Sequence, residues 1–393
     1  LVECGHDLHV ILVSHNKPAF TLDPRVVLHD CTGTEASSAA SGFEAEPGDA
    51  TQDEQSPKSK PKPERRTKQQ DEPMGPIAAY VRPIRVAVAN VVWGTLGSIL
   101  FAVGLIRRVG RLRRKLKATK PDAVLSFLTQ TNILTVLATR GLNTRTVISE
   151  RNDPRLQRHR PRVEWLRRLV YRHADLVTAN SRGALTALEP FVPKRKLAFL
   201  PNPLMPPTST EIASLQAPTI ITVGRLVEQK GIDVLLAAWA RAAAQLPEWR
   251  LAIVGDGPLR DSLQAQSREL GIEESVDWHG HLADPFPLLR ASKFFVMTSR
   301  FEGTPNALLE AMACGLPGIV SDASPGPCEL VGLDQTAGLI VPVEGAGETA
   351  EAIVRLAREE PLRRRLAAAA RERAREHEAD QALKVWLQLL RCE

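Results

Sequence analysis

The sequence is poor in cysteine, and its cysteines are not arranged for metal binding or cross-linking. The 393 residues include 5 cysteines, spread singly along the chain without the short Cys/His spacings that hold zinc. An odd, scattered set also gives no framework for a disulfide-stapled secreted domain. These absences favour a reducing cytoplasm and predict no metal site.

Two binding signatures are also missing. The segment GDGP at residues 255–258 lacks the third glycine of a dinucleotide fingerprint, so we interpret it as a tight turn. Aromatic residues make up only 5% of the chain, and no known nucleic-acid motif accompanies its basic residues. Nucleic acid is therefore not an expected partner.

The positive charge of the chain is unevenly distributed. The net charge is +6, but residues 107–172 contain 18 Lys or Arg against 4 acidic residues, so the remainder of the chain is net acidic. A one-sided basic region suits an anionic membrane surface or a phosphate-bearing acceptor. Both are candidate partners.

Length and patterning predict two α/β domains, the first over residues 1–204. The chain opens on the end of a helix and a strand, without a signal peptide. Residues 33–76 have few large apolar side chains, several prolines and mixed charges, which predicts a disordered insertion. An inert linker is favoured there over a regulatory tail.

An apolar and basic helix is predicted over residues 86–117. Residues 86–106 carry no charge and are long enough to cross a bilayer, and arginines follow at once. A crossing would, however, separate strands that should share one sheet. A buried or interfacial helix is favoured over a membrane-spanning one, and attachment to a membrane surface is the working hypothesis.

Strand, loop and helix patterns then alternate to the end of the chain. Strands are expected at residues 123–127 and 145–150, a helix from Asn132 onward, and another helix capped by Ser181. Residues 205–218, rich in Pro, Ser and Thr, predict an interdomain linker. Residues 219–375 predict a second α/β domain, and residues 376–393 a final helix.

The most informative stretch is residues 299–315, SRFEGTPNALLEAMACG. An apolar strand precedes it, and a helix is expected over residues 305–314, with Thr304 as N-cap, Pro305 at the first position and Gly315 at the end. The free N–H groups of the first helical turn attract an anion, and Gly303 would let a phosphate approach closely. A diphosphate would suit this place.

Two carboxylates flank the start of that helix. Glu302 lies just outside it and Glu310 about one and a half turns inside, so the two can touch different parts of one molecule. Taken alone, this common spacing favours a simpler interpretation, in which Glu302 caps the helix dipole and Glu310 is a solvated surface residue. Arg225 and Lys230, in the loop GRLVEQKG, would likewise ordinarily be solvated side chains.

These residues together resemble the signature of family-4 glycosyltransferases, retaining enzymes of the GT-B fold. The matching positions are Glu302, Gly303, Pro305, Glu310, Gly315, Pro317, Asp322 and the loop with Arg225 and Lys230. The resemblance covers residues 121–354 and implies two Rossmann-like domains facing across a cleft, with the final helix returning to the first domain. Because the family begins with a strand and a glycine-rich loop, it also implies that the first domain lacks its first strand here.

The resemblance also implies roles for the matching residues. Glu302 would contact the donor sugar, Glu310 the ribose, and the 303–306 loop (Gly303, Thr304, Pro305 and Asn306) the sugar and phosphate. Arg225 and Lys230 would neutralise the diphosphate of a UDP- or GDP-sugar, with Gly224 and Gly255 near the nucleotide. Neither a cofactor nor a metal is implied.

The acceptor side is less clearly marked. Many relatives place a histidine or another polar group in the acceptor cleft, where this chain has Glu150, Arg151 and Asn152 and no histidine. Glu150 and Asn152 are candidate acceptor-positioning residues, although Glu150 could equally pair with Arg151 or Arg155 on the surface. A glycan or lipid-linked acceptor is expected.

We therefore expect a cytoplasmic retaining glycosyltransferase of cell-envelope glycan assembly, peripheral to the membrane. No carboxylate can be assigned as a nucleophile, so a front-face substitution is preferred, in which the leaving phosphate accepts the acceptor proton and Glu302 holds donor hydroxyls. Two alternatives stay open at this point. One is a degenerate GT-B protein that binds without turnover, and the other is a GT-B epimerase or phosphorylase.

Overall fold

The structure is a computed structural model that describes residues 9–12, 27–30, 102–157, 159–204 and 217–390. The chain divides into two compact units, residues 7–108 in one and residues 1–6 with 109–393 in the other. The predicted insertion at 33–76 and most of the predicted apolar run at 86–106 and linker at 205–218 lie outside the described residues.

The smaller unit contains one short parallel strand pair. β1 (His9–Leu12) and β2 (Val27–Asp30) run side by side, with His9 opposite Val27 and Leu12 opposite Asp30. The strand at the opening of the chain was predicted.

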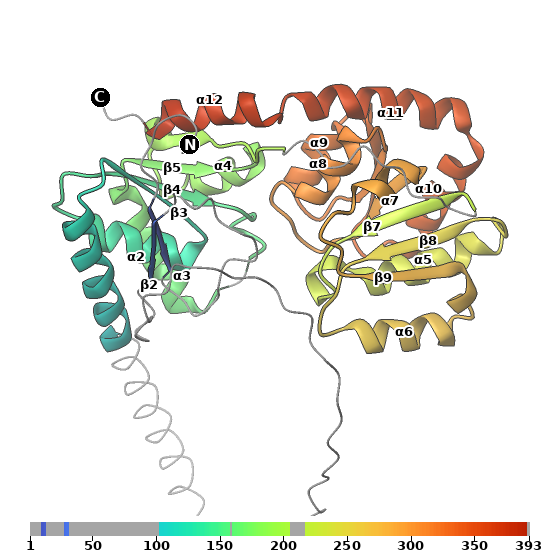
Figure 1. The fold of residues 1–393 in the computed structure, drawn as a ribbon, viewed down its shortest axis with the longest axis horizontal. Coiled ribbons are helices and arrows are strands. Elements are labelled where there is room, and N and C mark those ends of the chain that lie inside the picture. Colours follow the sequence, from blue (N-terminus) through green and yellow to red (C-terminus); the bar gives the residue numbers. More distant parts are fainter. Residues whose placement is uncertain (1–8, 13–26, 31–101, 158, 205–216, 391–393) are drawn as a thin grey trace, which may run out of the picture. The chain divides into compact units, whose positions relative to one another are not determined.

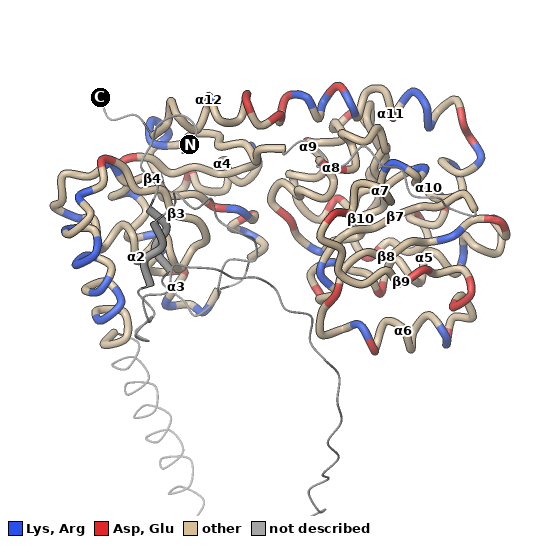
Figure 2. The backbone as a smooth tube through the Cα atoms, in the orientation of Figure 1, with Lys and Arg blue, Asp and Glu red and all other residues tan. Residues whose placement is uncertain are grey.

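Residues 102–119 form one helix, the described part of the predicted apolar and basic segment. Its residues Leu112 and Leu116 are buried, whereas Ile106 is exposed. Figure 2 shows Lys and Arg along this helix. Among the described helices, none combines the length and the hydropathy that a bilayer crossing requires.

The larger unit begins with a four-stranded parallel sheet in the order β3-β4-β5-β6. Apolar and β-branched runs such as AVLSF and RTVISE favour these strands. Of the intervening helices, one begins at Pro161 and another follows a capping residue, Ser181, which accepts the N–H of Ala184 (3.2 Å) as predicted. The elements are β3 (Ala123–Phe127), α2 (Thr129–Thr139), β4 (Arg145–Glu150), α3 (Pro161–Val170), β5 (Leu176–Ala179), α4 (Arg182–Leu188) and β6 (Leu197–Phe199).

The predicted start of the first of these helices was three residues late. α2 begins at Thr129 and not at Asn132. Its N-cap residue, Leu128, has φ of 71°, which a bulky L-residue rarely adopts, so no helix-start signal marked this position.

A second parallel sheet has six strands in the order β12-β11-β10-β7-β8-β9. Its strands are joined by helices, as the alternating pattern predicted (Figure 1). The elements are β7 (Thr219–Val223), α5 (Ile232–Ala243), β8 (Arg250–Val254), α6 (Arg260–Glu269), β9 (Val276–Gly280), α7 (Phe286–Ala291), β10 (Phe294–Met297), α8 (Asn306–Ala313), β11 (Gly318–Ser321), α9 (Pro325–Val331), β12 (Gly338–Val341) and α10 (Ala346–Arg358).

Each face of the six-stranded sheet carries its own apolar core. Because successive strand residues point to opposite faces, Ile220 packs with Trp239 of α5, and Ile221 packs in the cluster that contains Leu308 and Met312 of α8. The second cluster anchors α8, the helix that follows the loop with Glu302.

The chain ends by returning to the four-stranded sheet. α11 (Glu360–Arg375) packs against α8, and α12 (Ala379–Leu390) contacts β3 and β4. Trp386 Nε1 donates to Pro201 O (2.9 Å), and the Trp386 ring lies 5.9 Å from the Phe127 ring. The expectation that the last helix returns to the first domain is confirmed.

Candidate active site

The predicted donor residues gather at one edge of the six-stranded sheet. The carboxyl ends of parallel strands meet at the same edge, which is where doubly wound sheets bind ligands. Gly224 follows β7, Gly255 follows β8, and the loop with Glu302 follows β10. Residues that are distant in the sequence therefore lie together at the carboxyl edge of the six-stranded sheet.

Gly224 and Gly255 pack backbone to backbone at this edge. A Cβ atom on Gly255 would lie 1.8 Å from the carbonyl oxygen of Gly224, and Gly255 has φ of +139°, so only glycine fits. The N–H of Gly224 donates to Val254 O (2.9 Å). These glycines allow close packing of the two loops, and their predicted contact with a nucleotide stays a prediction.

Lys230 and Glu302 form an ion pair at the same edge. Lys230 Nζ lies 2.6 Å from Glu302 Oε1, and their side chains are 20% and 9% exposed. Gln229 Nε2 donates to Phe301 O (2.9 Å), which ties the two loops together. The Glu302 N–H donates to Ser324 Oγ (2.9 Å). A basic and an acidic group are thus held together at one place.

Arg225 and Glu310 are not joined to this pair. The Arg225 side chain is exposed and makes no hydrogen bond or ion pair with another described residue. Glu310 is half-buried, and its carboxylate likewise makes no hydrogen bond with the described residues. Burial, and next the charge of Asp284, raise the pKa of Glu310. Both side chains have polar atoms available for a ligand.

The start of α8 differs from the prediction. The helix begins at Asn306, Pro305 occupies the N-cap position, and no side chain caps it. Thr304 was predicted as the N-cap, but its hydroxyl donates to Asn180 O. The first turn holds no acidic residue, so its N–H groups remain suited to an anion.

Asn202 supports this loop and was not predicted to do so. Its Nδ2 donates to Thr304 O (2.8 Å) and to Asn306 Oδ1 (2.6 Å). The only sequence signal was the position of Asn202 between Pro201 and Pro203. An asparagine between two prolines has a restricted backbone and a free amide, which suits such a bracing role.

Gly303 also has a packing role that was not predicted. A Cβ atom there would lie 2.0 Å from Arg151 O and 2.7 Å from Asn180 Oδ1. The missing side chain therefore makes room for the backbone at the end of β4, and the predicted approach of a phosphate to Gly303 stays a prediction.

Glu150 is a buried residue, so the alternative of a surface pair with Arg151 or Arg155 was wrong. It is 1% exposed and accepts the hydroxyls of Thr129 (2.9 and 3.1 Å) and Tyr171. Arg155 pairs with Asp153 (2.6 Å). Burial raises the pKa of Glu150. Asn152 is partly exposed, and its predicted acceptor role stays a prediction.

A histidine does lie beside Glu150, although none was expected there. His159 Nε2 lies 3.0 Å from Thr129 Oγ1, the hydroxyl that donates to Glu150. The eight residues between Glu150 and His159 hid this proximity, because the loop that follows β4 folds back toward the start of α2.

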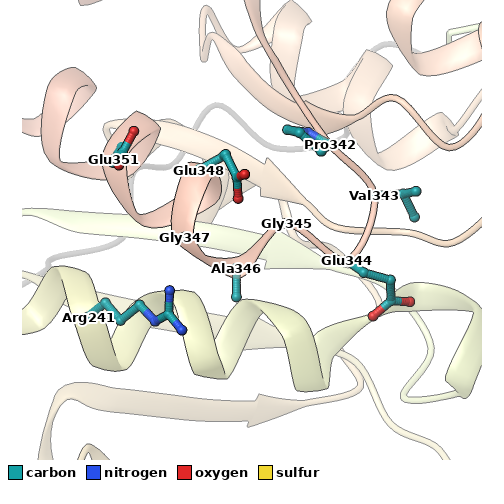
Figure 3. A pocket seen from close by; sticks show the side chains of 9 residues that line it. All are labelled: Arg241, Pro342, Val343, Glu344, Gly345, Ala346, Gly347, Glu348 and Glu351. Carbon is teal, nitrogen blue, oxygen red and sulfur yellow. The ribbon is translucent and has the colours of Figure 1, made fainter.

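A pocket at the start of α10 does not suit a diphosphate. It has a volume of about 720 Å³ and is lined by Arg241 and the carboxylates of Glu344, Glu348 and Glu351 (Figure 3). Three carboxylates would repel a diphosphate. A second pocket, of about 780 Å³, touches Thr304 and Pro201. Neither includes the predicted donor residues Arg225, Lys230, Glu302 and Glu310.

Within the described residues, no group of His, Cys, Asp or Glu is arranged to hold a metal ion.

Comparison with known proteins identifies both halves of the chain. Residues 1–203 match the glycosyl transferase 4-like domain, and residues 211–373 match the glycosyl transferases group 1. An N-acetylgalactosamine-N,N'-diacetylbacillosaminyl-diphospho-undecaprenol 4-alpha-N-acetylgalactosaminyltransferase from Campylobacter jejuni is 30% identical over 65% of this chain and 72% of its own length. The lipopolysaccharide core biosynthesis glycosyltransferase LpsE from Rhizobium meliloti is 33% identical over 50% of this chain and 58% of its own.

Solved structures show the same fold. Anabaena HepE in complex with UDP superposes with a TM-score of 0.65 at 20% identity, over 72% of this chain and 81% of that one. The lipopolysaccharide outer core galactosyltransferase WaaB superposes with a TM-score of 0.59 at 23% identity, over 74% and 80%. Together with the two parallel sheets, these likenesses show the GT-B fold. The chain belongs to the group 1, family-4-like glycosyltransferases, and it is a glycosyltransferase enzyme.

Proposed function

We propose that the enzyme moves a sugar, with retention of its anomeric configuration, from a UDP- or GDP-sugar to a lipid-linked glycan. The ion pair of Lys230 with Glu302 beside the uncapped start of α8 carries this proposal. Two Campylobacter jejuni relatives are named as transferases that act on undecaprenol-diphosphate-linked glycans, and the HepE structure contains UDP. The similarity to the two relatives supports a lipid-linked glycan as acceptor, and the similarity to HepE supports a UDP-sugar as donor.

The proposed chemistry needs no metal ion. Breaking the bond between sugar and phosphate places negative charge on the leaving diphosphate. Lys230, Arg225 and the N–H groups at the start of α8 stabilise that charge more strongly as it develops. The new bond forms on the face that the phosphate leaves, and the leaving phosphate takes the proton of the acceptor hydroxyl. Glu302 holds donor hydroxyls, and Glu310 the ribose.

The experiment screens UDP-N-acetylgalactosamine, UDP-galactose, UDP-glucose and GDP-mannose for binding. Each donor that binds is then offered undecaprenyl-diphosphate-linked N-acetylhexosamine, with EDTA present and absent. We expect one donor to give an α-linked product, seen by NMR, at a rate that EDTA leaves unchanged. A β-linked product or loss of activity in EDTA contradicts retention or metal independence, respectively. Binding without turnover of any acceptor contradicts the acceptor class.

The enzyme is further proposed to work at the cytoplasmic face of a membrane, and α3 supports this. Trp165 and Leu169 are 63% and 38% exposed, on the same helix face as Arg162, Arg168 and Arg172. Tryptophan among arginines is typical of the boundary between lipid headgroups and acyl chains, and the arginines attract anionic lipids.

Vesicle binding tests this membrane contact. We expect the full chain to sediment with vesicles of 30 mol% phosphatidylglycerol more than with neutral vesicles, and added salt to weaken the binding. W165A should reduce binding severalfold. The control L270A removes another exposed apolar side chain, beyond α6. Equal binding of W165A and L270A would count against this face.

A further inference from the structure

Thr129 and Glu150 fix the orientation of a histidine. Both carboxylate oxygens of Glu150 lie within hydrogen-bond distance of the Thr129 hydroxyl, at 2.9 and 3.1 Å. Burial raises the pKa of Glu150, but the hydroxyls of Tyr171 and Thr129 and the charge of Arg167 oppose this and favour the ionised carboxylate. A threonine hydroxyl has one proton, and an ionised carboxylate can only accept, so Thr129 donates to Glu150. The Thr129 oxygen must then accept from His159 Nε2, 3.0 Å away.

The surrounding hydrogen bonds prevent Glu150 from turning away. The Tyr171 hydroxyl donates to Glu150 and accepts from Asn132 Nδ2 (3.2 Å). Asn132 Nδ2 also donates to Ser149 O (2.9 Å), and Asn132 Oδ1 accepts from Ser126 (2.8 Å). All of these side chains are buried. The network is saturated and leaves Thr129 one direction for its proton.

The His159 ring is consequently held with its proton on Nε2 and its lone pair on Nδ1. The ring is partly exposed, and Nδ1 makes no hydrogen bond to another described residue. Burial, and next the charge of Arg167, lower the pKa of His159, while Glu164 opposes this effect. A neutral ring with a free Nδ1 is therefore favoured at pH 7.

This nitrogen lies at the carboxyl edge of the four-stranded sheet. Thr129 is the first residue of α2 and Glu150 the last of β4, so both stand at that edge. The residue after Glu150, Arg151, packs its carbonyl against Gly303 of the loop with Glu302. Leu128 next to Thr129 is 53% exposed and has a positive φ, a backbone strain that is concentrated at functional sites.

We propose that Nδ1 of His159 accepts a hydrogen bond from a hydroxyl group of the acceptor glycan. Glu150 acts through Thr129 as a positioning group that keeps this nitrogen unprotonated. Glu150 thereby serves the acceptor without touching it, which reconciles its burial with a role on the acceptor side. The inference rests on the proposed glycan acceptor and adds one specificity contact to it.

The proposal predicts different acceptor KM values for two variants in which an amide replaces the His159 ring. In H159Q the amide reaches the Nε2 position and keeps the contact to Thr129, but nothing replaces Nδ1. In H159N the amide oxygen can stand near Nδ1. We expect H159Q to raise the acceptor KM about tenfold, the value of one hydrogen bond, and H159N to raise it less.

E150Q tests the positioning role. The amide that this substitution introduces would donate its N–H to Thr129, whose proton would turn to Nε2 and drive the ring proton to Nδ1. The acceptor KM should rise about tenfold as in H159Q, although E150Q keeps the shape of the site.

The wild type should also show a pH dependence. Its acceptor KM should rise as the pH falls below the pKa of His159, because the protonated ring cannot accept a hydrogen bond. The titratable groups that face the ring are Glu150, Arg167 and Glu164.

Donor binding and an exposed histidine serve as controls. The donor Kd and the thermal midpoint should stay unchanged in H159Q, and H173Q should behave as wild type, because His173 is an exposed residue of the same unit. A wild type that uses no glycan acceptor contradicts the proposed function instead. An acceptor KM within twofold of wild type for both H159Q and E150Q would overturn this inference.

Discussion

Lys230 and Glu302 hold opposite charges together where the donor diphosphate is proposed to bind. Both side chains are largely buried, so removing either leaves the other without a partner in a poorly solvated place. Arg225, by contrast, is exposed and has no partner among the described residues. The site therefore combines one fixed cation with one that is free to reach a ligand.

Replacing Lys230 should slow transfer more than it weakens donor binding. We expect K230A to lower kcat by about 10²-fold, because its charge is most valuable when the diphosphate departs. Steady-state kinetics with the donor found by screening measures this. The control K293A removes an exposed lysine just before β10 and should stay near wild type. A K230A enzyme with normal kcat would show that the lysine serves only to neutralise Glu302.

Replacing Glu310 should weaken nucleotide binding more than it slows transfer. Its half-buried carboxylate makes no hydrogen bond in the described structure, which leaves both oxygens for ribose hydroxyls. We expect E310A to raise the nucleotide Kd roughly tenfold and to change kcat little. Calorimetric titration with UDP and GDP measures this, with E269A on the outside of α6 as the control. Unchanged affinity for both nucleotides would refute the assignment.

At the scale of elements, the loop from Ser299 to Pro305 fits between two backbones. Gly303 contacts Arg151 O, and a Cβ atom on Gly326 of α9 would lie 1.8 Å from Gly303 O. Three segments from separate parts of the chain therefore approach one another without side chains between them. Such close backbone contact depends on the tertiary fold, and the sequence showed only the glycine.

The substitution G303A should be far more disruptive than its chemistry suggests. Its Cβ atom would overlap the Arg151 carbonyl, so either the loop or the end of β4 must move. We expect a loss of about 1–3 kcal/mol in the free energy of unfolding, measured in urea, together with weaker donor binding. As the control, G110A lies in the 102–119 helix with open space around it and should stabilise by about 0.5–1 kcal/mol. If both variants behave alike, the contact with Arg151 does not constrain the loop.

For the whole molecule, the sequence predicted what periodicity and local signals determine. The alternating strands and helices, the cap at Ser181 and the return of α12 could all be predicted, because each depends on nearby residues or on a family signature. Contacts between segments that are distant in the sequence could not be predicted. Thr304 was expected to cap α8 and instead bonds to Asn180, and the pairing of His159 with Thr129 gave no signal. Polar side chains have several possible partners, and the tertiary fold selects among them.

We expect the contacts of α12 with the first sheet to couple the unfolding of the two sheets of the larger unit. Trp386 joins the final helix to the first sheet through its bond to Pro201 O and its contact with Phe127. Because the ring is only half-buried, we expect W386A to lower the free energy of unfolding by roughly 2 kcal/mol and to separate the unfolding of the two sheets. W386F, which loses the N–H bond and part of the indole ring but keeps an aromatic ring, should cost less, about 1 kcal/mol. W165A, with its exposed ring, should stay within about 0.5 kcal/mol of wild type. A single unchanged transition in W386A would mean that the sheets are coupled by other contacts.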